Sequence, residues 1–219
     1  MRRDNQDLSM GFWTVGEKYW NVVDLLCEGI VRNQNRNFVM SGVELRTEEI
    51  LERTKWSDGN LTVPLLFNFY HGAELMLKGF VLRDATLDRP PGHRLSTLLG
   101  SFATQYPDES GLVSLLQRYL VVDEMPEVLQ GFFRENGTTP DKFYDCLKYP
   151  FSKDLTVRFE HYGLVYKASR GIAFYRQLRD DIGAMMPIIV QLGRTLCREG
   201  ADRDRDSPRG EPLPHHGMY

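Results

Sequence analysis

The sequence predicts an all-α helical bundle, and three observations lead to that prediction. Apolar residues recur at helical spacing over 5–32 and over 167–198. Residues 63–83 are apolar on nearly every side, which is typical of a helix enclosed by other helices. With 42% hydrophobic and 11% aromatic residues, the chain can also bury a substantial core, which argues against global disorder.

The first third of the chain predicts one long helix and one short one. The long helix runs from about residue 5 to residue 32, and the polar segment 33–37 ends it. Thr47 can cap a short helix that reaches about residue 56, and two glutamates suit its first turn. Residues 57–60, Ser-Asp-Gly-Asn, predict a turn.

Prolines mark the expected helix starts in the middle of the chain. Pro64 suits the first turn of the apolar helix, where its missing N–H costs nothing. A loop over 88–92 should end that helix, and a new helix should begin near residue 93 and reach residue 106. Three further helix starts are expected at the later prolines, Pro107, Pro126 and Pro140.

The last third predicts a long helix and a tail. Residues 155–166 are rich in strand-forming side chains, so this segment forms either a short β-hairpin or an extended arm. The helix over 167–198 contains Pro187, which predicts a kink. We therefore expect a helical bundle over 1–199 and a disordered tail over 200–219, which has almost no apolar residues.

Charge and cysteine content exclude some classes of protein. The formal net charge of −3 gives no overall attraction for nucleic acid, so any contact with RNA would need a local site. The three cysteines are far apart in the sequence and odd in number, which favours reduced thiols in a cytosol. No apolar run approaches the ~20 residues of a membrane span, so we expect a cytoplasmic protein with no membrane partner.

The apolar helix carries one line of polar residues. His71, Glu74 and Lys78 are spaced i, i+3 and i+7, so they share one helix face. Polar groups on a buried helix must be paired, hydrated or functional. This line is either a partly hydrated ion pair facing a groove or a site where a ligand phosphate or a partner protein meets Lys78.

Two other places carry catalytic candidates. His93 follows Pro-Pro-Gly at a helix start, where it either satisfies nearby polar groups or acts as a general acid or base. Arg158 and His161 lie close together in the sequence: arginine can stabilise a phosphorane and histidine can move a proton, although a surface loop of mixed charge is the simpler explanation. We found no set of residues with metal-ligand spacing and no cofactor motif, so neither a metal nor a cofactor is expected.

Residues 63–99 resemble HEPN-domain proteins, in particular a prokaryotic branch in which Glu-Leu-x-Leu-Lys is followed by Gly-His-x-Leu. The matching segments are Glu74-Leu-Met-Leu-Lys78 and Gly92-His-Arg-Leu95, and the later Leu147-Lys-Tyr-Pro-Phe151 is similar to an Arg-Tyr-Pro stretch of that branch. The resemblance implies a helical bundle with a HEPN-like core over about 63–199, frequent homodimerisation, and a role in RNA cleavage, nucleotide binding, toxin–antitoxin pairs or phage defence.

The ribonuclease motif of that family is Arg, four to six residues, then His, and this chain departs from it. Arg158 and His161 are separated by two residues. The sequence therefore predicts a HEPN-like protein of a prokaryotic stress or defence system that binds RNA, a nucleotide or a partner such as an antitoxin, with a degenerate ribonuclease site. One alternative is an active metal-independent endoribonuclease that uses His161 or His93 with Arg158. The other is a purely structural dimerisation module.

Overall fold

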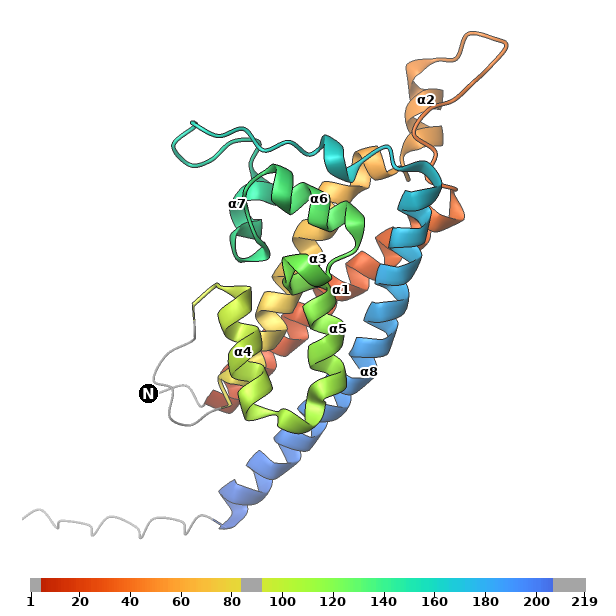
Figure 1. Ribbon diagram of the computed structural model, residues 1–219. Helices are drawn as coiled ribbons and strands as arrows, with labels where there is room; N and C mark the ends of the chain where they lie inside the picture. The colour runs from red at the N-terminus through yellow and green to blue at the C-terminus, as the bar shows by residue number, and fades with distance from the viewer. Residues whose placement is uncertain (1–4, 84–91, 207–219) are drawn as a thin grey trace, which may run out of the picture.

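The predicted all-α bundle is confirmed. The computed structural model describes residues 5–83 and 92–206, and within these residues there are helices but no β-strand (Figure 1). The α-helices are α1 (Asn5–Arg32), α2 (Thr47–Thr54), α3 (Asp58–Val81), α4 (Leu95–Gln105), α5 (Ser110–Leu120), α6 (Glu127–Glu135), α7 (Phe143–Lys148) and α8 (Ala168–Asp206). Short 3₁₀ turns lie at Pro107–Glu109, Val122–Glu124, Pro140–Lys142 and Tyr162–Leu164.

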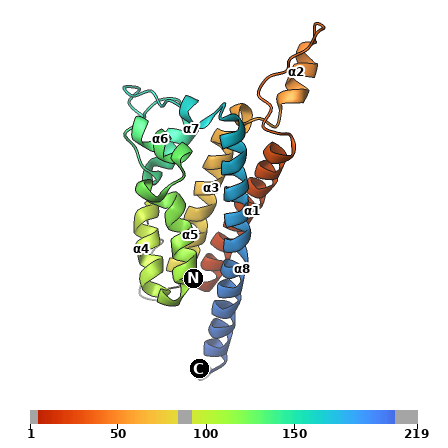
Figure 2. The same ribbon diagram turned by 45° about the vertical axis from the view of Figure 1, so that its right-hand side comes forward.

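Helix α3 is the centre of the bundle. The long helices α1 and α8 pack along one side of the molecule, with α1 making extensive contact with both α3 and α8 (Figures 1 and 2). Helices α4 and α7 pack on α3, and α5 links α4 to α8. Because α3 is covered from several directions, most of its residues are buried, as its apolar sequence predicted. Helix α2 projects from one end of the bundle (Figure 2).

The start of α3 differs from the prediction. We expected a turn over 57–60 and Pro64 in the first helical turn, but α3 begins at Asp58 and Pro64 lies inside it. The cause is tertiary: Asn35 Oδ1 accepts from the Asp58 N–H at 2.6 Å, and Asn37 Oδ1 accepts from the Gly59 N–H at 3.1 Å. These side chains satisfy N–H groups that a new helix leaves free, so the helix forms earlier than local turn propensity suggests.

The C-terminal third also differs in detail. Residues 155–166 form an extended arm with one 3₁₀ turn, and a single isolated bridge joins Phe151 to Arg158 in place of a hairpin. Helix α8 contains Pro187, as expected, and continues to Asp206, beyond the boundary expected at 199. The final part of the predicted tail, 207–219, and most of the predicted loop at 88–92 lie outside the described residues.

A buried aspartate ties three segments together at one end of the bundle. Asp58 is 0% exposed, and its carboxylate accepts from the Asn35 side-chain amide at 2.8 Å and from the backbone N–H groups of Tyr166 and Lys167 at 2.9 Å each. Tyr166 and Asn35 both have positive φ, 59° and 45°. Asp58 therefore joins the end of α1, the start of α3 and the residues that lead into α8.

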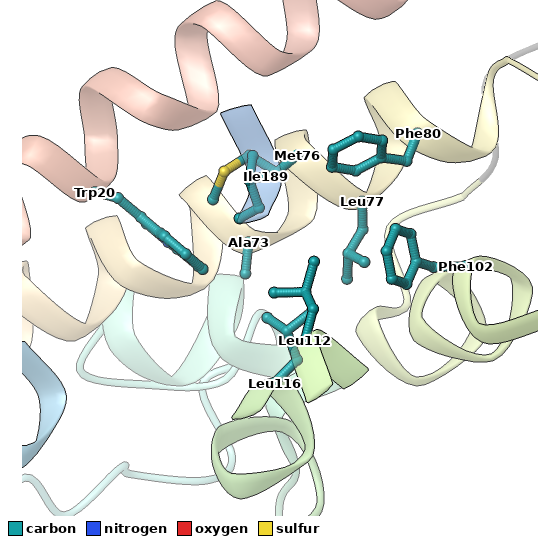
Figure 3. A pocket seen from close by; sticks show the side chains of 9 residues that line it. All are labelled: Trp20, Ala73, Met76, Leu77, Phe80, Phe102, Leu112, Leu116 and Ile189. Atoms are coloured by element: carbon teal, nitrogen blue, oxygen red, sulfur yellow. The ribbon is translucent and has the colours of Figure 1, made fainter. Parts of the chain in front are cut away.

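The core is closely filled. A void of about 10 Å³ lies between α3 and its neighbours. Figure 3 shows the side chains that line it, all of them apolar or aromatic. Those side chains are Trp20, Ala73, Met76, Leu77, Phe80, Phe102, Leu112, Leu116 and Ile189. A void of this size and chemistry offers a water no hydrogen-bond partner, so it is a packing gap and not a ligand site.

Helices α1 and α3 approach each other closely at two glycines, Gly16 in α1 and Gly72 in α3. A Cβ added at Gly72 would lie 2.5 Å from Trp20 Cδ1 and 3.1 Å from the carbonyl oxygen of Gly16. Trp20 cannot move aside, because it is fully buried and its Nε1 donates to the Phe69 carbonyl at 2.9 Å. Gly183 in α8 is the opposite case, with nothing within 4 Å of an added Cβ.

Alanine at Gly183 and alanine at Gly72 should therefore change stability in opposite directions. We expect Gly183→Ala to raise the free energy of unfolding by about 0.5–1 kcal/mol, because alanine is the better helix former. Gly72→Ala should lower it by about 1–3 kcal/mol, because the added methyl forces α1 and α3 apart. Urea denaturation of both variants measures the two signs, and stabilisation by Gly72→Ala would contradict the described α1–α3 contact.

Candidate functional site

The polar line predicted on α3 meets His93 at a buried carboxylate. Glu74 is 2% exposed, and its Oε1 accepts from Lys78 Nζ at 2.6 Å. The same oxygen lies 2.7 Å from His93 Nδ1, which belongs to the segment just before α4. His93 and the helix residues, separate candidates in the sequence, therefore form one cluster.

The geometry fixes the orientation of the His93 ring. A distance of 2.7 Å between Nδ1 and a carboxylate oxygen requires the proton on Nδ1, which donates to Glu74. The side chain is 84% exposed, and within the described residues no hydrogen bond is recorded for Nε2. A buried carboxylate thus holds an exposed imidazole in one tautomer, with Nε2 free for a ligand or a proton.

The cluster keeps Glu74 ionised. Burial alone would raise the pKa of Glu74, but the nearby His71 imidazole, hydrogen bonding from Lys78 and His93, and the charge of Lys78 outweigh it, so the pKa falls to about 2. The Lys78 side chain is only 7% exposed, and its ammonium lies 3.1 Å from His93 Nδ1 as well as against Glu74. Lys78 therefore serves mainly as the counter-ion of Glu74.

His71 extends the cluster towards α7. Its Nδ1 lies 3.9 Å from Glu74 Oε2, which is beyond direct hydrogen-bonding distance, and it has no hydrogen-bond partner among the described residues. The ring contacts three aromatic side chains, with centroid distances of 4.7 Å to Tyr19, 5.8 Å to Phe67 and 6.4 Å to Tyr144. The polar line thus continues into an aromatic surface formed by α1, α3 and α7.

The N-terminus of α4, close to His93 in the sequence, is already occupied by a carboxylate. Asp141 accepts from the Ser96 backbone N–H at 2.8 Å and from the Ser96 hydroxyl at 2.6 Å. The positive end of this helix is therefore neutralised from within the protein. His93 Nε2 is left as the group that the cluster offers to an anion.

Arg158 and His161 do not form a site together. Arg158 is exposed and its Nε pairs with Glu160 at 3.1 Å. His161 instead donates from Nε2 to the Cys146 carbonyl at 2.7 Å and stacks on Phe132. Within the described residues no hydrogen bond or ion pair joins Arg158 to His161. The first side chain faces solvent, and the second fastens the arm to the bundle.

Sequence reasoning did not name Tyr144, and it named Lys148 only within the segment 147–151 that resembles the HEPN branch. They are spaced i and i+4 on α7, and Lys148 Nζ lies 4.6 Å from the centre of the Tyr144 ring. Their spacing was visible in the sequence, but the contact of Tyr144 with His71 depends on the packing of α7 against α3. No pattern within α7 itself signals that contact.

Other candidate sites in the described residues are few. No group of three or more histidine, cysteine, aspartate or glutamate side chains is arranged to hold a metal ion in the ranges 5–83 and 92–206. A groove of about 410 Å³ lies between α1 and α8, lined by residues that include Trp13, Ile189 and Arg194. It shares no lining residue with the Glu74 cluster.

Comparisons with known proteins give no relative: no family model matches the chain, and neither a curated protein nor a solved structure is significantly similar to it. None of the helices in the described part of the chain has the length and apolar character needed to cross a membrane. The HEPN resemblance, the RNA, nucleotide or antitoxin partner and the homodimer therefore stay predictions.

Proposed function

We propose that this helical-bundle protein is HEPN-like and binds RNA through the Glu74–His93 cluster. The observation that carries the proposal is the 2.7 Å contact between Glu74 Oε1 and His93 Nδ1. It holds an exposed imidazole in a defined direction, so that Nε2 can donate to a phosphate oxygen when the ring is protonated. The buried ion pair beneath it preorganises this donor before the ligand arrives.

The cluster favours binding over cleavage. Cleavage by the 2′-hydroxyl route needs a group that moves a proton and a cation that stabilises the charge developing on the phosphate. His93 can supply the first, but the nearest cation, Lys78, is already bound to Glu74, and Arg158 pairs with Glu160. This arrangement supports the degenerate ribonuclease site. A metal-independent endoribonuclease is the second candidate, favoured by the carboxylate that orients His93.

The test compares two histidine variants in RNA binding. His93→Asn keeps a donor near the position of Nδ1, so it preserves the contact with Glu74 and removes only Nε2. We expect it to weaken the binding of a short fluorescent RNA about tenfold or more in an anisotropy titration, the effect of losing one charge-assisted hydrogen bond.

His161→Gln is the matched control, because a glutamine amide can replace the Nε2 donor to the Cys146 carbonyl. It should leave the affinity for RNA unchanged. The opposite pattern, with binding lost in His161→Gln and kept in His93→Asn, would move the site to the arm at 155–166. Cleavage of the RNA in EDTA that disappears in His93→Asn would establish the endoribonuclease instead.

A further inference from the structure

Two tyrosines and a lysine, lying on α7 and just after it, form an exposed aromatic surface. Tyr144 is 45% exposed and Tyr149 is 47% exposed. Lys148 Nζ lies 4.6 Å from the centre of the Tyr144 ring and 5.1 Å from that of Tyr149. We call these three residues the α7 shelf. Half-exposed aromatic rings beside an exposed cation are the combination that single-stranded nucleic acids use for stacking and for phosphate contact.

The α7 shelf is supported from beneath and is continuous with the Glu74 cluster. The Tyr144 ring packs on Phe67 at 5.5 Å and on His71 at 6.4 Å, so α3 holds it in place. His71 in turn lies beside Glu74, which holds His93. A chain of contacts therefore runs from the shelf through one imidazole and one carboxylate to the exposed imidazole of His93.

We propose that the α7 shelf stacks an unpaired RNA base on Tyr144 or Tyr149 while Lys148 contacts the adjoining phosphate. This inference rests on the proposed function and narrows its ligand to single-stranded RNA. Lys148 contacts the tyrosines through exposed cation–π interactions and through a long hydrogen bond of 3.4 Å from Nζ to the Tyr144 hydroxyl, and contacts of both kinds are weak at an exposed site. A phosphate can therefore draw the ammonium away at little cost and leave the ring face to a base. Bases within a duplex have no free face, so duplex RNA cannot use the shelf.

The experiment measures anisotropy with a single-stranded RNA of about ten nucleotides and with the same strand annealed to its complement. We expect the wild-type protein to prefer the single strand. Tyr144→Leu and Tyr149→Leu should each weaken single-strand binding about fivefold to a hundredfold, the range for loss of one stacked base. Tyr162→Leu is the matched control, because this tyrosine is exposed and its ring contacts Tyr166 instead of Tyr144 or Tyr149, so the affinity of this variant should equal that of the wild type.

The role of Lys148 is measured separately, through the salt dependence of RNA affinity. Lys148→Met should reduce the slope of log affinity against log salt by about 0.7, the value for one phosphate of a single strand. Lys153→Met, the exposed control, should leave the slope unchanged. Circular dichroism checks that the Tyr144 variant keeps its fold, and Tyr149→Leu gives the same test at a side chain that packs on no α3 ring.

The outcomes separate the shelf from the proposed function. Single-strand binding that falls in His93→Asn but not in either tyrosine variant would overturn the shelf and leave the proposed function standing. Loss in the tyrosine variants with no effect of His93→Asn would support the shelf and overturn the role of His93. Equal affinity for duplex and single strand would overturn the shelf, and no binding of either RNA by the wild type would overturn both.

Discussion

Asp58→Ala should lower the free energy of unfolding by about 3–5 kcal/mol, among the largest losses expected of any single substitution in this chain. The Asp58 carboxylate is fully buried and accepts three hydrogen bonds, two of them from backbone N–H groups at Tyr166 and Lys167. Alanine leaves two part-buried backbone donors and the buried Asn35 amide without their acceptor, and this loss costs up to about 1–3 kcal/mol for each donor. It also removes the contact that holds Tyr166 at a φ of 59°.

Thermal and urea denaturation measure this loss, and a chain of this size should melt about 10 °C lower. Asp58→Asn keeps one acceptor oxygen, so an intermediate loss is expected. Asp180→Ala is the matched control: Asp180 is an exposed aspartate of α8, and its replacement should change stability by no more than about 0.5 kcal/mol. Equal stability of the Asp58 and Asp180 alanine variants would contradict the role given to Asp58.

The same carboxylate shows where sequence reasoning about the fold succeeds and where it stops. Helix α1 has the predicted bounds, because its apolar periodicity is local and the polar segment after Arg32 ends it. The predicted start of α3 was wrong. Ser57 to Asn60 favours a turn on its own, but the Asn35 and Asn37 side chains accept hydrogen bonds from backbone N–H groups at the start of the helix and so stabilise it. A contact between residues more than twenty positions apart leaves no trace in the local pattern.

The candidate site divides in the same way. The line of His71, Glu74 and Lys78 follows from helical spacing, and the structure has all three on one face. That His93 joins them depends on the path of the chain between α3 and α4, which no spacing rule determines. The pair Arg158 and His161 is the converse case. Closeness in sequence suggested a site, but the arm gives each side chain a different partner.

Glu74 makes the stability of the protein depend on pH in a defined window. The pKa of Glu74 is about 2 in the folded protein, against an ordinary value of 4.5. Because the folded pKa is the lower one, ionised Glu74 stabilises the fold above pH 4.5, and this contribution is lost as the pH falls from about 4.5 towards 2. A difference of this size corresponds to about 3 kcal/mol.

The Glu74→Gln variant isolates that contribution. Glutamine has the shape of the protonated side chain, so the variant lacks the charge at every pH. We expect wild type to exceed Glu74→Gln in unfolding free energy by about 2–3 kcal/mol at pH 7, and the difference to shrink to about 1 kcal/mol or less by pH 2.5. Glu44→Gln, at an exposed glutamate, controls for the general effect of removing an acid and should match the wild type throughout. A difference between wild type and Glu74→Gln that stays constant from pH 7 to pH 2.5 would contradict the depressed pKa.

The functional consequence follows from the same carboxylate. At neutral pH Glu74 is fully ionised, so it always accepts from His93 Nδ1 and always directs Nε2 outward. In Glu74→Gln the amide can still accept through its oxygen, but the charge that strengthens the hydrogen bond is gone. The affinity of Glu74→Gln for RNA at pH 7 should therefore fall between that of wild type and that of His93→Asn. A Glu74→Gln variant that binds as tightly as wild type would show that the His93 ring does not need the charge of Glu74.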